Sequence, residues 1–107
     1  FKDFDKLLAV TKDEKFVTAR HCLQSIWKVG LGGRNAQIMV VKGLEKRYQE
    51  CAKEKNGSLI RYDILVGLHN LYEATTSSEI KERALELIEL EKDMKYKKKY
   101  ASVWKKV

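Results

Sequence analysis

The chain has 107 residues, of which 44% are hydrophobic and 35% are charged, and its formal net charge is +7. This composition is typical of one folded domain and excludes a disordered segment, which would have too little apolar surface to bury. No apolar run approaches the roughly 20 residues that a transmembrane helix needs, and the opening Phe-Lys-Asp-Phe-Asp does not match a secretory signal. We therefore expect no membrane partner. Proline is absent and glycine is scarce, which favours long uninterrupted helices.

The positive charge is unevenly distributed along the chain. Residues 1–57 hold 12 basic and 7 acidic side chains (net +5), and residues 58–94 hold 4 basic and 8 acidic ones (net −4). Residues 95–107 hold 6 basic side chains and no acidic one. Two basic ends therefore flank an acidic middle, and the high net charge does not by itself indicate a nucleic-acid-binding protein.

Cysteine and histidine usage limits the redox and metal chemistry that the chain can support. Cys22 and Cys51 lie inside predicted helices and have no CxxC spacing. We expect both to be buried, reduced thiols of a cytoplasmic protein. A structural zinc site needs four ligands, and His21 and His69 with two distant cysteines do not supply a recognisable set. We therefore expect no metal and no other cofactor.

Three amphipathic helices are predicted in the first half of the chain. The first covers residues 1–10, the second residues 11–33, and the third runs from Arg34 to about Lys55. Thr11 followed by Glu14 fits a capping box at the start of the second helix. Three glycines are expected to end that helix where a left-handed residue is needed: Gly30, Gly32 and Gly33.

Polar turns predict where the fourth and fifth helices begin. In the stretch Asn56-Gly57-Ser58, we expect Gly57 to adopt a positive φ and Ser58 to cap the fourth helix. Thr76 with Glu79 repeats the capping-box pattern and predicts the start of the fifth helix.

A sixth helix is predicted although no Gly or Pro separates it from the fifth. The apolar face that contains Ile80 and Leu87 does not continue in phase into Tyr96 and Tyr100. A turn near residues 93–95 removes the conflict. Because the connections are short, successive helices are expected to be antiparallel neighbours. The first residue is not Met, so the sequence is compatible with two interpretations. The chain is either a complete domain or a fragment of a longer repeat protein.

One pattern occurs three times: a basic residue followed by apolar residues three and seven positions later. The first copy, Ala19-Arg20-x-x-Leu23-x-x-x-Trp27, is followed 41 residues later by Ile60-Arg61-x-x-Ile64-x-x-x-Leu68 and, 36 residues beyond that, by Lys97-x-x-Tyr100-x-x-x-Trp104. A two-helix unit of about 40 residues is typical of HEAT and armadillo solenoids.

With these motifs the chain resembles the HEAT-like (armadillo-type) helical repeat family. Asp13-Glu14 ahead of Ala19-Arg20 looks like the acidic turn and hydrophobic-Arg pair of that family's second helices. The resemblance implies a single all-α domain over residues 1–107, with about six antiparallel helices stacked as three hairpins in an α-solenoid (HEAT-like superhelix). It also implies that Arg20 and Arg61 tie neighbouring repeats together through carboxylates and helix ends. Trp27 and Trp104 lie on apolar faces and are expected in the core.

The sequence does not indicate an enzyme. His21 and His69 occupy comparable places on two helices and could pair with the cysteines, but no third group that would orient such a pair is evident. The loop from Gly30 to Arg34 precedes a helix, yet it lacks the Lys-Ser/Thr of a Walker loop, so a simple helix-terminating loop is favoured. No small-molecule substrate is indicated.

Solenoids of the HEAT type bind partners through a concave face lined by the second helix of each pair. In this chain that face would also present Thr18, Glu73, Ser102 and Lys105. We single out six residues of the face as candidates for binding: His21, Gln24, Lys28, Tyr62, His69 and Lys98. A polar surface of mixed charge suits an acidic or amphipathic protein segment. The leading hypothesis is therefore a non-catalytic scaffold that binds a protein partner.

The alternative hypothesis is a HEAT-like domain that binds nucleic acid through its basic C-terminal helix. Residues 95–99 combine four lysines with Tyr96, and Tyr100 follows, so charge for phosphates and rings for stacking occur together. The same lysines would also complement the dipole of a solvated helix and balance the acidic fifth helix.

Overall fold

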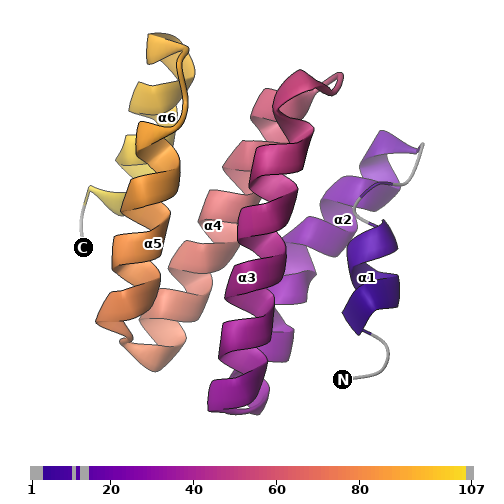
Figure 1. Ribbon diagram of the computed structural model, residues 1–107, viewed down its shortest axis with the longest axis vertical. Helices are drawn as coiled ribbons and strands as arrows, with labels where there is room; N and C mark the ends of the chain where they lie inside the picture. The colour runs from indigo at the N-terminus through magenta and orange to yellow at the C-terminus, as the bar shows by residue number, and fades with distance from the viewer. Residues whose placement is uncertain (1–3, 11, 13–14, 106–107) are drawn as a thin grey trace.

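Six α-helices account for most of the residues that the computed structural model describes, which are 4–10, 12 and 15–105. They are α1 (Phe4–Val10), α2 (Phe16–Ile26), α3 (Arg34–Glu50), α4 (Gly57–Thr75), α5 (Ser78–Glu89) and α6 (Met94–Trp104) (Figure 1). Two short 3₁₀ segments, η1 (Trp27–Gly32) and η2 (Cys51–Lys53), continue α2 and α3. The described part of the chain contains no β-strand, so the predicted all-α class with six helices is confirmed. None of these helices is long and apolar enough to cross a bilayer.

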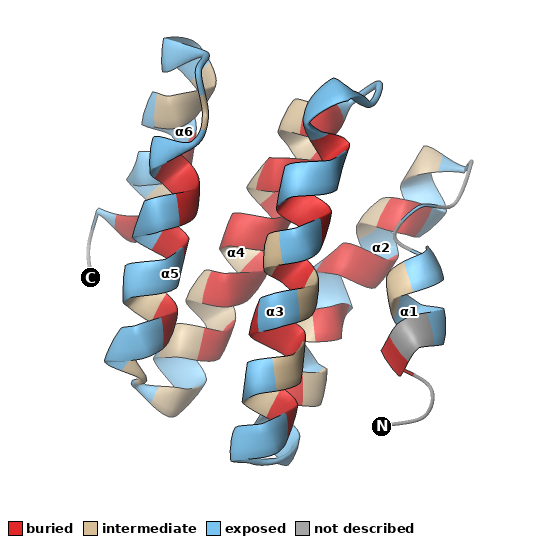
Figure 2. Ribbon diagram, in the orientation of Figure 1, coloured by how far each residue is buried: buried red, intermediate tan, exposed pale blue. Residues whose placement is uncertain are grey.

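Helix α4 lies at the centre of the fold. It packs against α2, α3, α5 and α6 and against both 3₁₀ segments. Four of its aliphatic residues are fully buried: Ile64, Leu65, Leu68 and Leu71. Figure 2 shows buried residues along most of α4, whereas α3 and α5 alternate buried and exposed residues. The hydrophobic core of the described residues is therefore built around α4.

The helices form two layers. In Figure 1, α1, α3 and α5 lie nearer the viewer, and α2, α4 and α6 lie behind them. The Cα extents of 36 × 33 × 18 Å describe a slab whose short dimension fits two helices, which pack about 8–10 Å apart. One face of the slab is therefore formed by α2, α4 and α6.

The second helix differs from its predicted bounds at both ends. It begins at Phe16, after Lys15, and the predicted capping box at Thr11 and Glu14 lies outside the described residues. Its end is tightened into η1, and Gly33 alone of the three glycines takes a positive φ (128°). Gly30 serves a different purpose, because a Cβ there would lie 2.8 Å from a methyl group of Leu71.

Two of the predicted caps are wrong. Asn56, not Gly57, adopts the left-handed conformation (φ 64°) and is the N-cap of α4 in place of Ser58. Gly57 is the first helical residue, and a Cβ there would overlap the carbonyl oxygen of Cys51. Thr76 takes a positive φ (53°) and ends α4, so Ser77 rather than Thr76 precedes α5.

The predicted break before the last helix is confirmed, but it lies at residues 90–93, earlier than the predicted turn near residues 93–95. Helix α5 ends at Glu89 and α6 begins at Met94. The Asp93 side chain accepts a hydrogen bond of 2.9 Å from the Lys95 backbone N–H and so caps α6. The carboxylate also lies at the positive end of the helix dipole, which favours a start at this position.

Two arginines, the half-buried Arg20 and the buried Arg61, join different helices, as predicted for both. Arg20 donates to both oxygens of Asp63 on α4, at 2.8 and 3.0 Å. Arg61 donates to the backbone oxygen of Tyr48 at the end of α3 (3.0 Å) and to Glu91 after α5 (2.7 Å). These are contacts to carboxylates and to a helix end, as expected.

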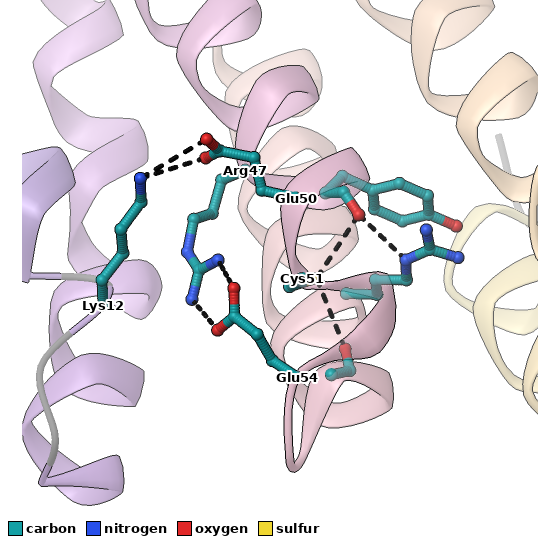
Figure 3. A network of polar contacts seen from close by, with 8 residues as sticks. Lys12, Arg47, Glu50, Cys51 and Glu54 are labelled. Atoms are coloured by element: carbon teal, nitrogen blue, oxygen red, sulfur yellow. Dashed lines mark hydrogen bonds and ion pairs between the residues drawn. The ribbon is translucent and has the colours of Figure 1, made fainter.

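A further ionic cluster, which the sequence did not suggest, closes the end of α3. Arg47 is almost fully buried and donates two hydrogen bonds to Glu54, at 2.6 and 2.8 Å. Figure 3 shows this pair beside Lys12 and Glu50, whose charged atoms lie 3.2 Å apart. The Cys51 thiol faces backbone oxygens in the same region. Cys51 and Cys22 are both buried and unbridged, as predicted.

Candidate interaction surface on α2, α4 and α6

One side of α4 faces away from the layer that α1, α3 and α5 form. Its side chains recur at steps of three and four residues, which places them in one row along the helix. The row combines aliphatic, aromatic and ionisable groups, all half-buried except the exposed last one: Leu59, Tyr62, Val66, His69 and Glu73. We call these five residues the α4 row. Two of the predicted binding residues, Tyr62 and His69, belong to it.

Helix α6 holds the side chains of the α4 row from one flank. The Lys99 Nζ atom lies 4.9 Å from the centre of the Tyr62 ring, a cation–π distance. The His69 ring meets the Trp104 ring edge-on with centroids 5.0 Å apart. His69 Nε2 also lies 3.4 Å from a carboxylate oxygen of Glu73. Tyr62 and His69 are therefore fixed in place while part of each stays open to solvent.

Helix α2 forms the other flank. The Arg20–Asp63 pair fixes it to α4, and the Arg20 guanidinium also lies 5.7 Å from the centre of the Phe16 ring. Trp27 approaches α4 where Gly67 has no side chain, because a Cβ at Gly67 would be 3.7 Å from the Trp27 Cβ. The Trp27 indole N–H donates to the Gln24 carbonyl oxygen at 3.0 Å. This half-buried tryptophan thus packs against the core without being enclosed in it, whereas Trp104 is buried as predicted.

The structure brings only some of the six predicted binding residues together. Three of them lie on α2 and on η1, which continues it, and all three are exposed: His21, Gln24 and Lys28. Lys98 instead lines a groove between α5 and α6.

The lysine that reaches Tyr62 is Lys99, which belongs to the basic cluster of residues 95–99 but is not among the six predicted binding residues. Its spacing could have identified it, because Tyr96, Lys99 and Val103 follow steps of three and four along one side of α6.

A second concave region lies between α3 and α5 in the other layer. Ile38 and Ile80 line it, and Arg34, Glu45 and Arg83 are among its charged lining residues. Glu45 and Arg83 face each other at 3.6 Å. Burial raises the pKa of Glu45 above its ordinary value of 4.5, and the charge of Arg83 opposes this effect.

The described groups offer little for nucleophilic or metal chemistry. Burial raises the pKa of both Cys22 and Cys51, which disfavours the reactive thiolate at each position. Within residues 4–10, 12 and 15–105, no three His, Cys, Asp or Glu side chains are grouped so that they could hold a metal ion. The α4 row and its flanks instead present aromatic rings, aliphatic groups and cations.

Comparisons with known proteins do not extend this description. The chain matches no protein-family model, and no curated protein and no solved structure shows significant similarity to it.

Proposed function

We propose that this chain is a non-catalytic helical-repeat scaffold that binds a protein partner across the face formed by α2, α4 and α6. The observation that carries the proposal is the α4 row, whose half-buried aromatic and aliphatic side chains remain open between two flanking helices. Partly exposed aromatic residues held rigidly are the groups that contribute most binding energy at protein interfaces.

The arrangement of helices supports a HEAT-like organisation of three stacked hairpins. The three second helices, α2, α4 and α6, share one layer, and α4 contacts the other two. In a solenoid this layer lines the binding face. The three basic residues of the repeated motif, Arg20, Arg61 and Lys97, each form an ion pair with a carboxylate from another part of the chain.

The partner that fits this face is an amphipathic segment with acidic side chains. The α4 row supplies Tyr62 and Val66 for apolar contact, while Lys28 and Lys99 add positive charge at its flanks. Glu73 is the single acidic member of the row. An acidic segment with aliphatic or aromatic anchors would therefore match both the apolar and the charged parts of the face.

Site-specific photocrosslinking tests this proposal. A photoreactive phenylalanine analogue replaces Tyr62, and in a matched control it replaces Glu82, an exposed residue of α5 in the other layer. We expect the probe at position 62 to capture one protein reproducibly, and the probe at position 82 not to capture that protein. The captured protein is then purified and its affinity for the chain is measured by calorimetry.

Variants at the same surface decide whether the captured partner uses it. Tyr62→Ala and Lys99→Glu should each weaken binding about tenfold, which corresponds to about 1.4 kcal/mol. Lys28→Glu and Lys98→Glu then report whether the partner also reaches the α2 flank or the far side of α6. Unchanged affinity in both the Tyr62 and Lys99 variants would show that this face is not the binding surface.

Nucleic acid is the second candidate partner, because α6 exposes several lysines beside aromatic rings. Lys95, Lys98 and Lys99 are exposed, and the Lys95 Nζ atom lies 5.8 Å from the centre of the Tyr96 ring. Binding of labelled single strands and duplexes, followed by fluorescence anisotropy, should then weaken steeply with added salt. No binding at low ionic strength rules this function out.

A further inference from the structure

A groove follows the outer edge of the slab between α5 and α6. Figure 1 shows that α5 and α6, the two helices that line the groove, lie at the opposite edge of the slab from α1. Its walls include Leu85, Glu86 and Glu89 from α5, and Lys98, Ala101 and Lys105 from α6. This edge is distinct from the α4 row, because α6 lies between the two.

The floor of the groove is apolar and partly open to solvent. Leu85 is 41% exposed, and Ala101 on the opposite wall is also exposed. The buried Trp104 lies at the base. An exposed apolar strip with charged borders is typical of a protein-interaction site.

The two borders of the groove carry opposite charges. Glu86 and Glu89, one helical turn apart, form an acidic border on α5. Lys98 and Lys105, two turns apart, form a basic border on α6. The Glu89 carboxylate bonds to Lys97 at 2.9 Å, yet its side chain remains 73% exposed and can contact a second partner.

We propose that the occupant of this groove is a second copy of the chain, related by a two-fold axis that runs parallel to α5 and α6. Such an axis places the acidic border of one protomer opposite the basic border of the other, and does so twice. The apolar strips, with Leu85 and Ala101, then face each other across the axis. The charges of the groove favour a second copy as its occupant, because the acidic border of one chain is complementary to the basic border of another.

The apolar contact is tested first, by sedimentation velocity of the 107-residue chain over a wide range of concentration. We expect the wild type to form dimers. Leu85→Asp should raise the dimer dissociation constant about tenfold or more, because it places a charge in the apolar strip. The matched control is Leu31→Asp, a change at a 52%-exposed leucine of η1, and it should leave the dimer intact. A wild type that stays monomeric, or a dimer that tolerates Leu85→Asp, would overturn the proposal.

Charge exchange between two variants tests the symmetry. One variant carries Glu86→Lys and Glu89→Gln, which retains an acceptor for Lys97, and the other carries Lys98→Glu and Lys105→Glu. Each should dimerise about tenfold more weakly than the wild type, because Glu86→Lys, Lys98→Glu and Lys105→Glu bring like charges together across the axis and Glu89→Gln removes an attraction.

Mixing the two variants should restore a dimer that contains one chain of each. This recovery is expected because the acidic border of one variant again faces the basic border of the other. Circular dichroism of each variant serves as the control for folding. Two weakened variants that fail to associate in the mixture would exclude a second copy in this orientation, and an unrelated partner would not produce the rescue at all.

Discussion

At the scale of single residues, Gly57 is the position where a side chain is least tolerable. A Cβ there would overlap the Cys51 carbonyl oxygen, a backbone atom that cannot move without η2. We expect Gly57→Ala to lower the free energy of unfolding by about 1–3 kcal/mol, the usual cost of forcing atoms into a packed site.

Gly32→Ala is the matched control for this change in urea denaturation. Its added Cβ would lie 3.7 Å from the Ala36 Cβ, an ordinary contact. The control should remain within about 0.5 kcal/mol of the wild type, the usual range for changes that disturb no special feature. Equal losses in the two variants would show that the close approach at Gly57 is unimportant.

The caps show what local sequence could not predict. Asn tolerates the left-handed conformation, and Asn56 takes it because the neighbouring Gly57 is needed for a close backbone approach. That approach depends on how η2 folds back on α4, which no local pattern contains. Thr76 is a β-branched residue with positive φ, an uncommon choice that sequence propensity argues against. The Thr76–Glu79 capping box was therefore a reasonable but wrong prediction.

At the scale of helices, the Arg20–Asp63 pair couples α2 to α4. Asp63 is 3% exposed and Arg20 is 33% exposed, so removing the arginine strands a buried carboxylate. We expect Arg20→Met to lower the free energy of unfolding by about 3 kcal/mol. Asp63→Leu should cost less, because the arginine can turn toward solvent.

A double-mutant cycle measures this coupling. The chain with both Arg20→Met and Asp63→Leu should be more stable than the sum of the two single losses predicts, since neither charge is then left alone. Chemical denaturation of the four proteins gives the interaction energy. Strict additivity would mean that the two side chains do not depend on each other.

The contact of α6 with α4 includes one hydrogen bond that can be isolated. The buried Tyr100 hydroxyl donates to the Ser58 carbonyl oxygen at 2.7 Å, whereas the Tyr48 hydroxyl has no hydrogen-bond partner within the part of the chain that the structure describes. Tyr100→Phe should therefore cost about 1 kcal/mol of unfolding free energy. Tyr48→Phe should be neutral or stabilising, because it removes an unsatisfied polar group. A larger loss for Tyr48→Phe in thermal denaturation would contradict this assignment.

Helix number and the last boundary could be predicted because they depend on local periodicity. The phase change between Leu87 and Tyr100 requires a break, and the chain does break there, at residues 90–93. The face on which each charged residue ends was harder to predict. Lys98 and Lys99 are adjacent in the sequence but serve opposite sides of α6, one toward α5 and the other toward Tyr62. Only the rotation of α6 about its axis, set by the packing of Tyr100 and Trp104, decides between them.

At the scale of the whole molecule, the central position of α4 follows from its composition. It is the helix with apolar residues on most of its circumference, so it must be surrounded. The apolar residues of this stretch could have indicated its central place, but the sequence could not show that α3 and α5 cover one side and leave the α4 row open on the other. That outcome depends on contacts between residues far apart in the chain, such as Arg61 with Glu91 and Arg20 with Asp63.

Two glutamates should shift the stability of the whole domain in opposite directions as the pH changes. Hydrogen bonds from Arg47 lower the pKa of Glu54 below its ordinary value of 4.5. Glu54 therefore stabilises the fold above that value, and this contribution is lost as the pH falls through its folded pKa. Glu54→Gln should cost about 1–2 kcal/mol at neutral pH, with the difference from wild type shrinking only below about pH 4.5.

Glu45 has the opposite sign, because burial raises its pKa above 4.5. A carboxyl group that binds its proton more tightly in the folded state than in the unfolded state destabilises the fold when it is ionised. The wild type should therefore gain stability as the pH falls from neutral through the raised pKa of Glu45. Glu45→Gln should thus leave the free energy of unfolding at neutral pH unchanged or raise it. As the pH falls, any gain over wild type should disappear at a higher pH than the one at which the stabilisation by Glu54 begins to be lost. Urea denaturation at a series of pH values separates the two windows. If Glu45→Gln were destabilising at neutral pH, the ion pair with Arg83 would outweigh the cost of burying the carboxylate.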